Sequence, residues 1–263
     1  MDSAVSVLRD GPVRLESLED GAIWRAVLNT PKANILDMEK CGLLSEIFLQ
    51  AGENPKLKAI VIQGEGPHFS FGASIQEHLP DQIEAMLHGF HQLFYSMLDA
   101  RVVTLAAVSG QCLGGGMELA IFCNRLFASR GAVLGQPEII LGVIAPVASV
   151  MLADRVGRSR AEHLLLTGGS MSAAEGMAIG LVDELTDDPG AAALEYAQEH
   201  LLPKSASSLR FAVKAARAGF EERVRKELAE VERLFLEELI ITSDAQEGLT
   251  AFLEKREPKW NKA

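Results

Sequence analysis

Two acidic residues, Glu118 and Glu138, stand twenty positions apart in glycine-containing stretches, GQCLGGGMELA (110–120) and GQPEIILG (135–142). Two carboxyl groups in one site can divide proton transfer between them when burial or a neighbouring charge keeps one protonated at neutral pH. Each glutamate ends a predicted strand–helix unit, and such units can converge above one edge of a sheet. The pattern predicts a candidate acid/base pair, although Pro137-Glu138 alone is a common surface sequence.

The glycine run Gly114–Gly116 fits neither of the common phosphate loops. A P-loop needs GxxxxGK[ST], and no Lys-Ser or Lys-Thr follows a glycine pair in this chain. The dinucleotide fingerprint GxGxxG has Leu119 where its third glycine belongs. These mismatches argue against a bound nucleotide at this stretch.

Two interpretations of the glycine run remain. A buried strand over 102–109 is followed by a glycine corner and a helix that opens at about Gly115, and the first helical turn has free N–H groups and a positive dipole end. Bare backbone there can act as an oxyanion hole, with Glu118 beside it and a second amide from Gly72-Ala73 in HFSFGASIQEH (68–78). Alternatively, the glycines only permit close packing and Glu118 only complements the helix dipole. This stretch alone leaves both open.

The elements that must position these residues alternate between strands and helices. A hairpin is predicted over 13–29, helices over 38–55 and 83–100, buried strands over 57–66 and 102–110, and a short strand with a turn over 132–142. This alternation favours an α/β core around a largely parallel sheet. After about Ala161 the pattern is almost wholly helical, apart from a short strand expected within 173–186. Two amphipathic helices are predicted over 205–219 and 221–240.

The amino-acid composition and net charge argue against several classes of protein. Hydrophobic residues make up 48% of the 263 residues, which is typical of a globular chain, and the net charge of −11 disfavours binding to nucleic acid or anionic membranes. The uncharged stretches are shorter than the ~20 apolar residues of a membrane helix. Three cysteines without CxxC spacing favour a reducing cytoplasm. His88 and His91 lack a further predictable ligand, so we expect no metal site.

Taken together, the motifs resemble the enoyl-CoA hydratase/isomerase (crotonase) superfamily from Val13 to about Lys259. The strongest matches are HFSFGAS, SGQCLGGGMELA, GQPEIILG, LTGGSMSAAEGMAIGLVDEL and SDAQEGLTAFLEKREPKW. The resemblance implies a crotonase spiral of ββα units in a core domain (1–200), followed by a helical C-terminal oligomerisation region (201–263). It also implies an acyl-CoA thioester as substrate, no separate cofactor, and a homotrimer or a hexamer built as a dimer of trimers.

Carried over position by position, the resemblance assigns roles to individual residues. The amides of Ala73 and Gly115 match the oxyanion-hole donors, while Glu118 and Glu138 match the glutamates that activate water and move a proton. Substrate and CoA contacts are expected from Lys32, Ala33, Phe71, Gly72, Ser74, Ile75, Gly114, Phe252 and Lys255. Hydration of a conjugated thioester develops enolate charge on the carbonyl oxygen, so donors placed there stabilise the transition state more than the substrate.

Departures from the family pattern narrow the expected substrate. Gly72-Ala73-Ser74 replaces a common Gly-Ala-Asp, and a glycine-rich loop after the second glutamate is replaced by VIAPVAS (143–149). Together with NTPKANILD, the stretch FSFGASIQEHLP is most similar to the cyclohexa-1,5-dienecarbonyl-CoA hydratases of anaerobic aromatic degradation, the benzoyl-CoA pathway. Such enzymes add water to a cyclic dienoyl thioester in the 1,4 sense. The alternatives are an ordinary enoyl-CoA hydratase or isomerase and, disfavoured by the acidic charge and the retained glutamates, a non-catalytic RNA-binding member.

Overall fold

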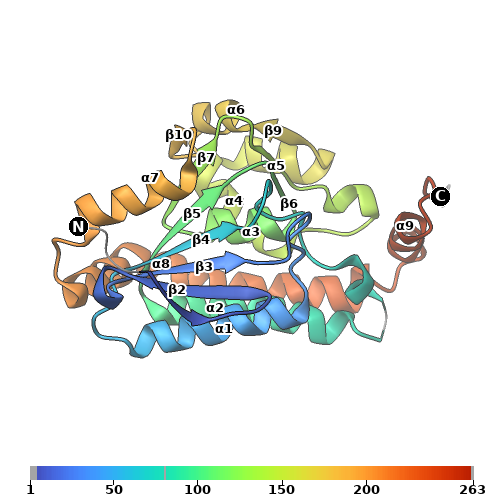
Figure 1. Cartoon of the computed structure of the whole chain (residues 1–263). Helices are drawn as coiled ribbons and strands as arrows, with labels where there is room; N and C mark the ends of the chain where they lie inside the picture. The colour runs from blue at the N-terminus through green and yellow to red at the C-terminus, as the bar shows by residue number, and fades with distance from the viewer. Residues whose placement is uncertain (1–4, 80, 262–263) are drawn as a thin grey trace.

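A seven-stranded sheet runs through the middle of the molecule (Figure 1). The structure, a computed structural model, describes residues 5–79 and 81–261. The strands follow the order β1-β2-β3-β4-β5-β7-β10, antiparallel from β1 to β3 and parallel from β3 onward. Their bounds are Ser6–Arg9, Val13–Leu18, Ile23–Leu28, Ala59–Gly64, Val103–Val108, Arg125–Ser129 and Glu184–Thr186. The predicted hairpin is β2–β3, and the predicted α/β core with a mainly parallel sheet is confirmed.

Helices cover both faces of this sheet because its central strands are apolar on both sides. In β4, Ile60 and Ile62 face one core and Ala59 and Val61 face the other, as the alternation of side chains along a strand requires. The larger core lies under α1 (Met38–Glu53) and α2 (Ile83–Ala100). The smaller one is covered by α7 (Pro189–Tyr196) and the π-helical turn η4 (Ala197–Leu201).

A second sheet of three short strands lies beside the first. It consists of β6 (Gln111–Leu113), β8 (Val133–Gly135) and β9 (Ser170–Ser172). Between and after these strands run α3 (Gly115–Phe122), the 3-10 helix η3 (Glu138–Leu141), α4 (Pro146–Val156), α5 (Arg158–Thr167) and α6 (Ala173–Ala178). The sequence analysis did not predict β9, since its residues Ser-Met-Ser show no alternation of apolar side chains.

The C-terminal region departs from the prediction at one point. Instead of two helices separated near Gly219, α8 is a single helix over Ala206–Arg233 that continues into the π-helical segment η5 (Leu234–Leu239). A helical glycine costs about 1 kcal/mol relative to alanine. Burial of Val224 and Leu228 in the main core outweighs that local cost. The prediction failed because it relied on a local helix breaker and could not include tertiary packing.

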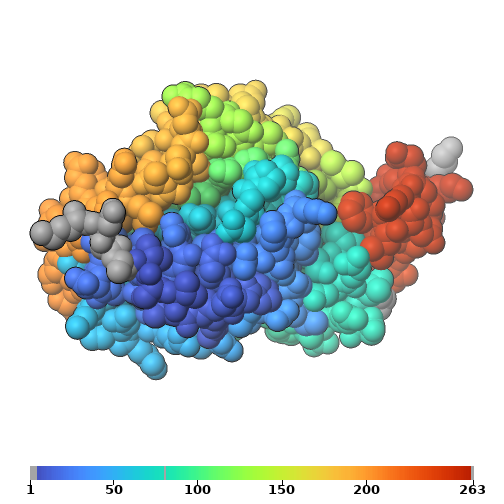
Figure 2. Space-filling view, viewed as in Figure 1, coloured from blue at the N-terminus to red at the C-terminus, as the bar shows by residue number. Residues whose placement is uncertain are grey.

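The last helix, α9 (Ser243–Leu253), stands out from the body of the molecule. Figure 2 shows the C-terminal segment as a separate knob at one end of the surface. None of the helices in the described parts of the chain is long and apolar enough to cross a membrane.

Arg210 of α8 joins three helices through their backbones. Its guanidinium donates to the carbonyls of Ala51 at 2.8 Å, Asn54 at 2.6 Å and Gly52 at 3.3 Å, at the end of α1, and to Ala100 at 2.8 Å, at the end of α2. The last carbonyls of a helix have no partner within it, so one planar fork satisfies orphan acceptors of two helices at once.

We therefore predict that Arg210→Met destabilises the fold by about 2–4 kcal/mol, because several bonds to a charged donor are lost together. Thermal unfolding followed by circular dichroism measures this loss. Arg210→Lys should recover little of it, since an ammonium group cannot reach both helix ends. A lysine variant as stable as the wild type would contradict the explanation.

Candidate active site

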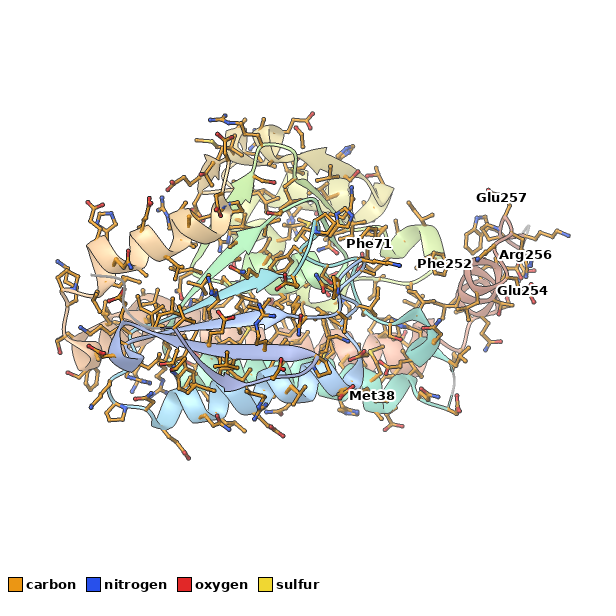
Figure 3. All side chains as sticks on the ribbon, in the orientation of Figure 1. Met38, Phe71, Phe252, Glu254, Arg256 and Glu257 are labelled. Carbon is orange, nitrogen blue, oxygen red and sulfur yellow. The ribbon has the colours of Figure 1, made fainter. Side chains whose placement is uncertain are left out.

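A cavity of about 590 Å³ opens between η3, the segment that follows β4, and α9. Nine of the thirteen residues predicted for the site line it: Ala33, Phe71, Gly72, Ala73, Ser74, Ile75, Gly114, Glu138 and Phe252. Phe71 and Phe252 reach it from opposite directions, one from the body of the chain and one from α9 (Figure 3). Segments predicted separately from the sequence thus meet at one place.

Four predicted residues lie outside this lining. Gly115 and Glu118 belong to α3, directly behind the wall, and both are buried. Lys32 and Lys255 are exposed and do not face the cavity in this chain. The cavity therefore brings together the predicted acyl site but neither of the two lysines expected to contact CoA.

Ala73 and Gly115 present their backbone amides close to each other. A Cβ atom built on Gly115 would lie 3.2 Å from the nitrogen of Ala73 and 3.0 Å from the ring of Phe90. Likewise, a Cβ on Gly72 would lie 3.4 Å from the nitrogen of Gly115. Within the described chain neither amide has a hydrogen-bond acceptor, and Gly115, as the first residue of α3, has none inside its helix. Two free N–H groups therefore stand side by side at the cavity wall.

Ser70 and Asn34 hold the segment that carries the Ala73 amide. The Ser70 hydroxyl donates to the Asn34 carbonyl at 2.8 Å and accepts from the Gly72 amide at 3.0 Å. The Asn34 side chain donates to the carbonyls of Glu65 and His68 at 3.0 and 2.9 Å. These bonds fix the backbone before any ligand arrives, which is the condition for efficient stabilisation of developing charge.

Gly114 permits the carboxyl group of Glu138 to approach the backbone. A Cβ on Gly114 would collide with Oε1 of Glu138, and Gly114 also has φ +50°. The positive φ therefore favours glycine at this position, and a side chain there would displace the Glu138 carboxyl from the place it has in this structure. The glycine run serves close approach of Glu138 and exposure of the neighbouring amide, which favours the first of the two interpretations drawn from the sequence.

Glu118 is buried, with 2% of its surface exposed, and its side chain extends from α3 to the N-terminus of α4. Its Oε1 accepts a hydrogen bond of 2.8 Å from the Ala148 amide, and the Val147 amide also stabilises the ionised form. Burial outweighs both amides and raises the pKa of Glu118 to about 7. When it is ionised, the Glu118 carboxylate is nevertheless stabilised by these two amides and by the positive end of the α4 helix dipole.

Glu138 has a still less favourable environment for a charge. Its Oε2 is buried and has no hydrogen-bond partner among the described residues. Burial and, after it, the neighbouring charge of Glu118 raise the pKa of Glu138 to about 8. The two carboxyls titrate as a coupled pair. Near neutral pH the geometry favours the proton on Glu138 and the charge on Glu118.

Several lining residues escaped the sequence analysis: Ile35, Gln76, His78, Leu113, Pro137, Ile140, Leu141, Val143 and Leu253. Most are apolar, and only their nearness to the motifs could have indicated them. His78 is held by a 2.7 Å contact between Nδ1 and the Ser74 carbonyl, and burial lowers its pKa, so the ring is neutral. No cluster of three or more metal-ligand side chains occurs in residues 5–79 and 81–261. His88 and His91 instead contact the Glu232 carboxyl group of α8.

Comparisons with known proteins agree on one family. The enoyl-CoA hydratase/isomerase family matches residues 19–263. A cyclohexa-1,5-dienecarbonyl-CoA hydratase of Thauera aromatica is 50% identical over 249 residues, which cover 95% of this chain and 96% of that protein. A probable enoyl-CoA hydratase of Mycobacterium bovis is 35% identical, with 92% and 95% covered. The crystal structure of an enoyl-CoA hydratase from Mycobacterium avium subsp. paratuberculosis superposes with a TM-score of 0.84 at 25% identity, covering 97% of this chain and all of that one.

The raised pKa of Glu138 makes a prediction about stability. The native carboxyl keeps its proton between pH ~4.5 and ~8 while the unfolded one loses it, so stability falls as pH rises through this window. Glu138→Gln should therefore have a higher melting temperature than the wild type at pH 8, where the wild-type protein keeps a buried proton at a cost, and the same melting temperature as the wild type at pH 4. Differential scanning calorimetry at the two pH values measures this difference, with Glu53→Gln on the exposed end of α1 as the control. A lower melting temperature for Glu138→Gln at pH 8 would refute the burial cost.

Proposed function

Because this chain belongs to the enoyl-CoA hydratase/isomerase family and has the crotonase fold, we propose that it is a hydro-lyase that adds water to a conjugated acyl-CoA thioester. The observation that carries this proposal is the pair of free amides, Ala73 and Gly115, beside two buried carboxyls whose pKa values are raised to different extents. Hydration needs these parts together: donors for an enolate oxygen, one base and one acid.

The proposed substrate is cyclohexa-1,5-diene-1-carbonyl-CoA, an intermediate of anaerobic aromatic degradation. Its support is the 50% identity, along almost the whole of both chains, to the hydratase of that name from Thauera aromatica. The predominantly apolar lining of the cavity suits a hydrocarbon ring. Relatives that are probable enoyl-CoA hydratases share much less of the sequence, 35% in the Mycobacterium bovis protein.

In the proposed mechanism the thioester oxygen lies between the amides of Ala73 and Gly115. Attack on the conjugated system moves an electron pair onto this oxygen, and both amides bind the resulting enolate more tightly than the starting carbonyl. Loss of one donor in an oxyanion hole typically costs ~10²–10³ in rate. The positive end of α3 adds to the same effect, since Gly115 opens that helix.

The carboxyl pair then divides the remaining steps. Ionised Glu118 accepts a proton from water as the water oxygen bonds to ring carbon C2, and the electrons move through C1 onto the thioester oxygen. Protonated Glu138 delivers a proton to C5, at the far end of the C2=C1–C6=C5 diene, which leaves a C1=C6 double bond. One water is added, and the pair resets when the proton gained by Glu118 is transferred to Glu138, directly or through solvent. For a simple enoyl thioester the proton goes instead to the carbon next to the carbonyl.

CoA binding is proposed for the edges of the cavity. The loop of Lys32 and Ala33 would contact the nucleotide end, and its anchoring by the side chain of Asn34 supports this role. Phe71, Ser74 and Ile75 would line the path of the pantetheine arm. Phe252 and Lys255 would complete it from the C-terminal segment. No cofactor is proposed, because CoA is part of the substrate.

We further propose a homotrimer or a hexamer, assembled through the helical region 201–263. Exposed apolar side chains in this region support it, including Phe211 at 70% and Ile241 at 67% of their surface. No partner is proposed among nucleic acids or membranes. A cytoplasmic location agrees with the three unpaired cysteines, Cys41, Cys112 and Cys123.

The substrate proposal predicts that the purified protein hydrates cyclohexa-1,5-dienecarbonyl-CoA more efficiently than crotonyl-CoA. Loss of the conjugated chromophore gives the rate, and mass spectrometry identifies the added water. Turnover of crotonyl-CoA alone would replace the dienoyl substrate with an ordinary enoyl one. Double-bond migration without a gain in mass would indicate an isomerase, and failure on both esters would reject a hydratase.

For the carboxyl pair we expect Glu118→Gln and Glu138→Gln each to lower kcat by ~10²–10⁴-fold, the usual contribution of a general acid or base. Affinity for a saturated CoA ester should stay within a few-fold of wild type. The wild-type profile of kcat/KM against pH should be bell-shaped, because one carboxyl must be ionised and the other protonated, and both limbs should lie above the usual pKa of a glutamate because burial raises the pKa of both groups. Near-normal turnover in both variants would show that the pair does not carry out the chemistry.

A further inference from the structure

A second, smaller cavity lies on the other side of Glu138. It has a volume of about 180 Å³, and Glu138 is the residue that lines both cavities. Its other lining residues are Gln136, Ile139, Ile144, Ala145, Ser149, Glu162, Leu165 and Leu166. Ser149, Glu162 and Leu166 are exposed, whereas Gln136 has only 1% of its surface exposed. The cavity therefore extends from exposed residues of α4 and α5 to Glu138.

Two residues that line this cavity, Gln136 and Glu138, have buried polar atoms without a hydrogen-bond partner. Oε1 and Nε2 of Gln136 and Oε2 of Glu138 are all buried without a hydrogen-bond partner in the described chain. A buried amide left in this state costs about 1–3 kcal/mol, so such atoms normally have a partner. A site with two to four polar groups and enough volume holds ordered water. Gln136 offers one donor and one acceptor, which together match a water molecule.

The proposed hydration needs a supply of water to the carboxyl pair while the substrate is bound. Each turnover consumes one water and requires a new proton on Glu138. When the thioester occupies the large cavity, its acyl group and CoA arm stand between Glu138 and the solvent on that side. The small cavity is also lined by Glu138, and most of its other lining side chains are apolar and would not trap ions.

From this arrangement we infer that the small cavity is the route by which water reaches the carboxyl pair during turnover, and that Gln136 holds the water at its inner end. The inference rests on the proposed hydratase function. Gln136 is thus a positioning residue: it binds and orients the water that Glu118 and Glu138 use. Ser149, at the mouth, limits the width of the route.

The test compares two exchange rates at chemical equilibrium. The first is the rate at which ¹³C label passes between the unsaturated and hydroxylated CoA esters, which counts chemical events. The second is the rate at which ¹⁸O leaves the hydroxylated ester for solvent, which counts water molecules that escape. The ester pair used is the one that the wild-type protein interconverts. If escape is slowed, the released water adds back and the ratio of ¹⁸O loss to ¹³C transfer falls.

Ser149→Phe closes the mouth with an exposed residue and should lower this ratio about threefold or more, with kcat reduced up to about tenfold and KM for the ester little changed. Gln136→Leu removes the amide at similar size and should also lower the ratio. Matched controls are Ser149→Ala, which keeps the route open, and Ala153→Phe, one turn further along α4 and outside the cavity. Both controls should retain the wild-type ratio.

The outcomes separate this inference from the proposed function. A wild-type protein without hydratase activity would reject the function itself. An active protein with an unchanged ratio in Ser149→Phe would overturn the route, and an unchanged ratio in Gln136→Leu would overturn the role of Gln136. Because the ratio is internal to each variant, a general loss of stability or of active protein does not move it.

Discussion

The arrangement of the active site depends on one constraint: the carboxyl groups of Glu118 and Glu138 are both buried, and the charge of Glu118 raises the pKa of Glu138. Removing a carboxylate from water costs several kcal/mol, and a second one beside it adds repulsion. The fold limits this cost unequally. Glu118 receives the amides at the start of α4, whereas Oε2 of Glu138 receives no partner from the described protein. Because the two carboxyl groups have different hydrogen-bond partners, two identical side chains take different protonation states.

The surrounding backbone follows from the same constraint. A side chain on Gly114 would displace the Glu138 carboxyl, and a side chain on Gly115 would crowd the Phe90 ring and the Ala73 amide. The segment after β4 must then hold Ala73 opposite, which the bonds of Ser70 and Asn34 achieve. Three loops from different strands of the two sheets are thereby fixed relative to one another. This rigid arrangement has an entropic cost, because glycine loses more conformational freedom on folding than any other residue.

Much of this arrangement could be predicted from the sequence, since it depends on local patterns. Alternating apolar residues indicated the β2–β3 hairpin, and the end of a buried strand followed by glycines indicated a helix opening at Gly115. Other features depend on contacts between distant segments. The continuity of α8 past Gly219 comes from packing, and the unpaired amide of Gln136 becomes visible only when the neighbouring helices are in place. The two lysines assigned to CoA stay predictions, because in this single chain they are exposed and are not among the residues that line the cavity.

Segments from the N-terminal and the C-terminal parts of the chain meet in the wall of the large cavity. Ala33 and Ile35 come from the loop after β3, while Phe252 and Leu253 come from α9, which packs closely enough on η3 that Gly248 must be bare against the Leu141 carbonyl. Contacts of such large sequence separation carry a loop-closure entropy cost that local contacts do not. A partly folded chain can therefore have its sheet and still lack a binding site. Any thioester bound to the complete cavity would hold these distant segments together and stabilise the native state by an amount that grows with the logarithm of the ratio of its concentration to its dissociation constant.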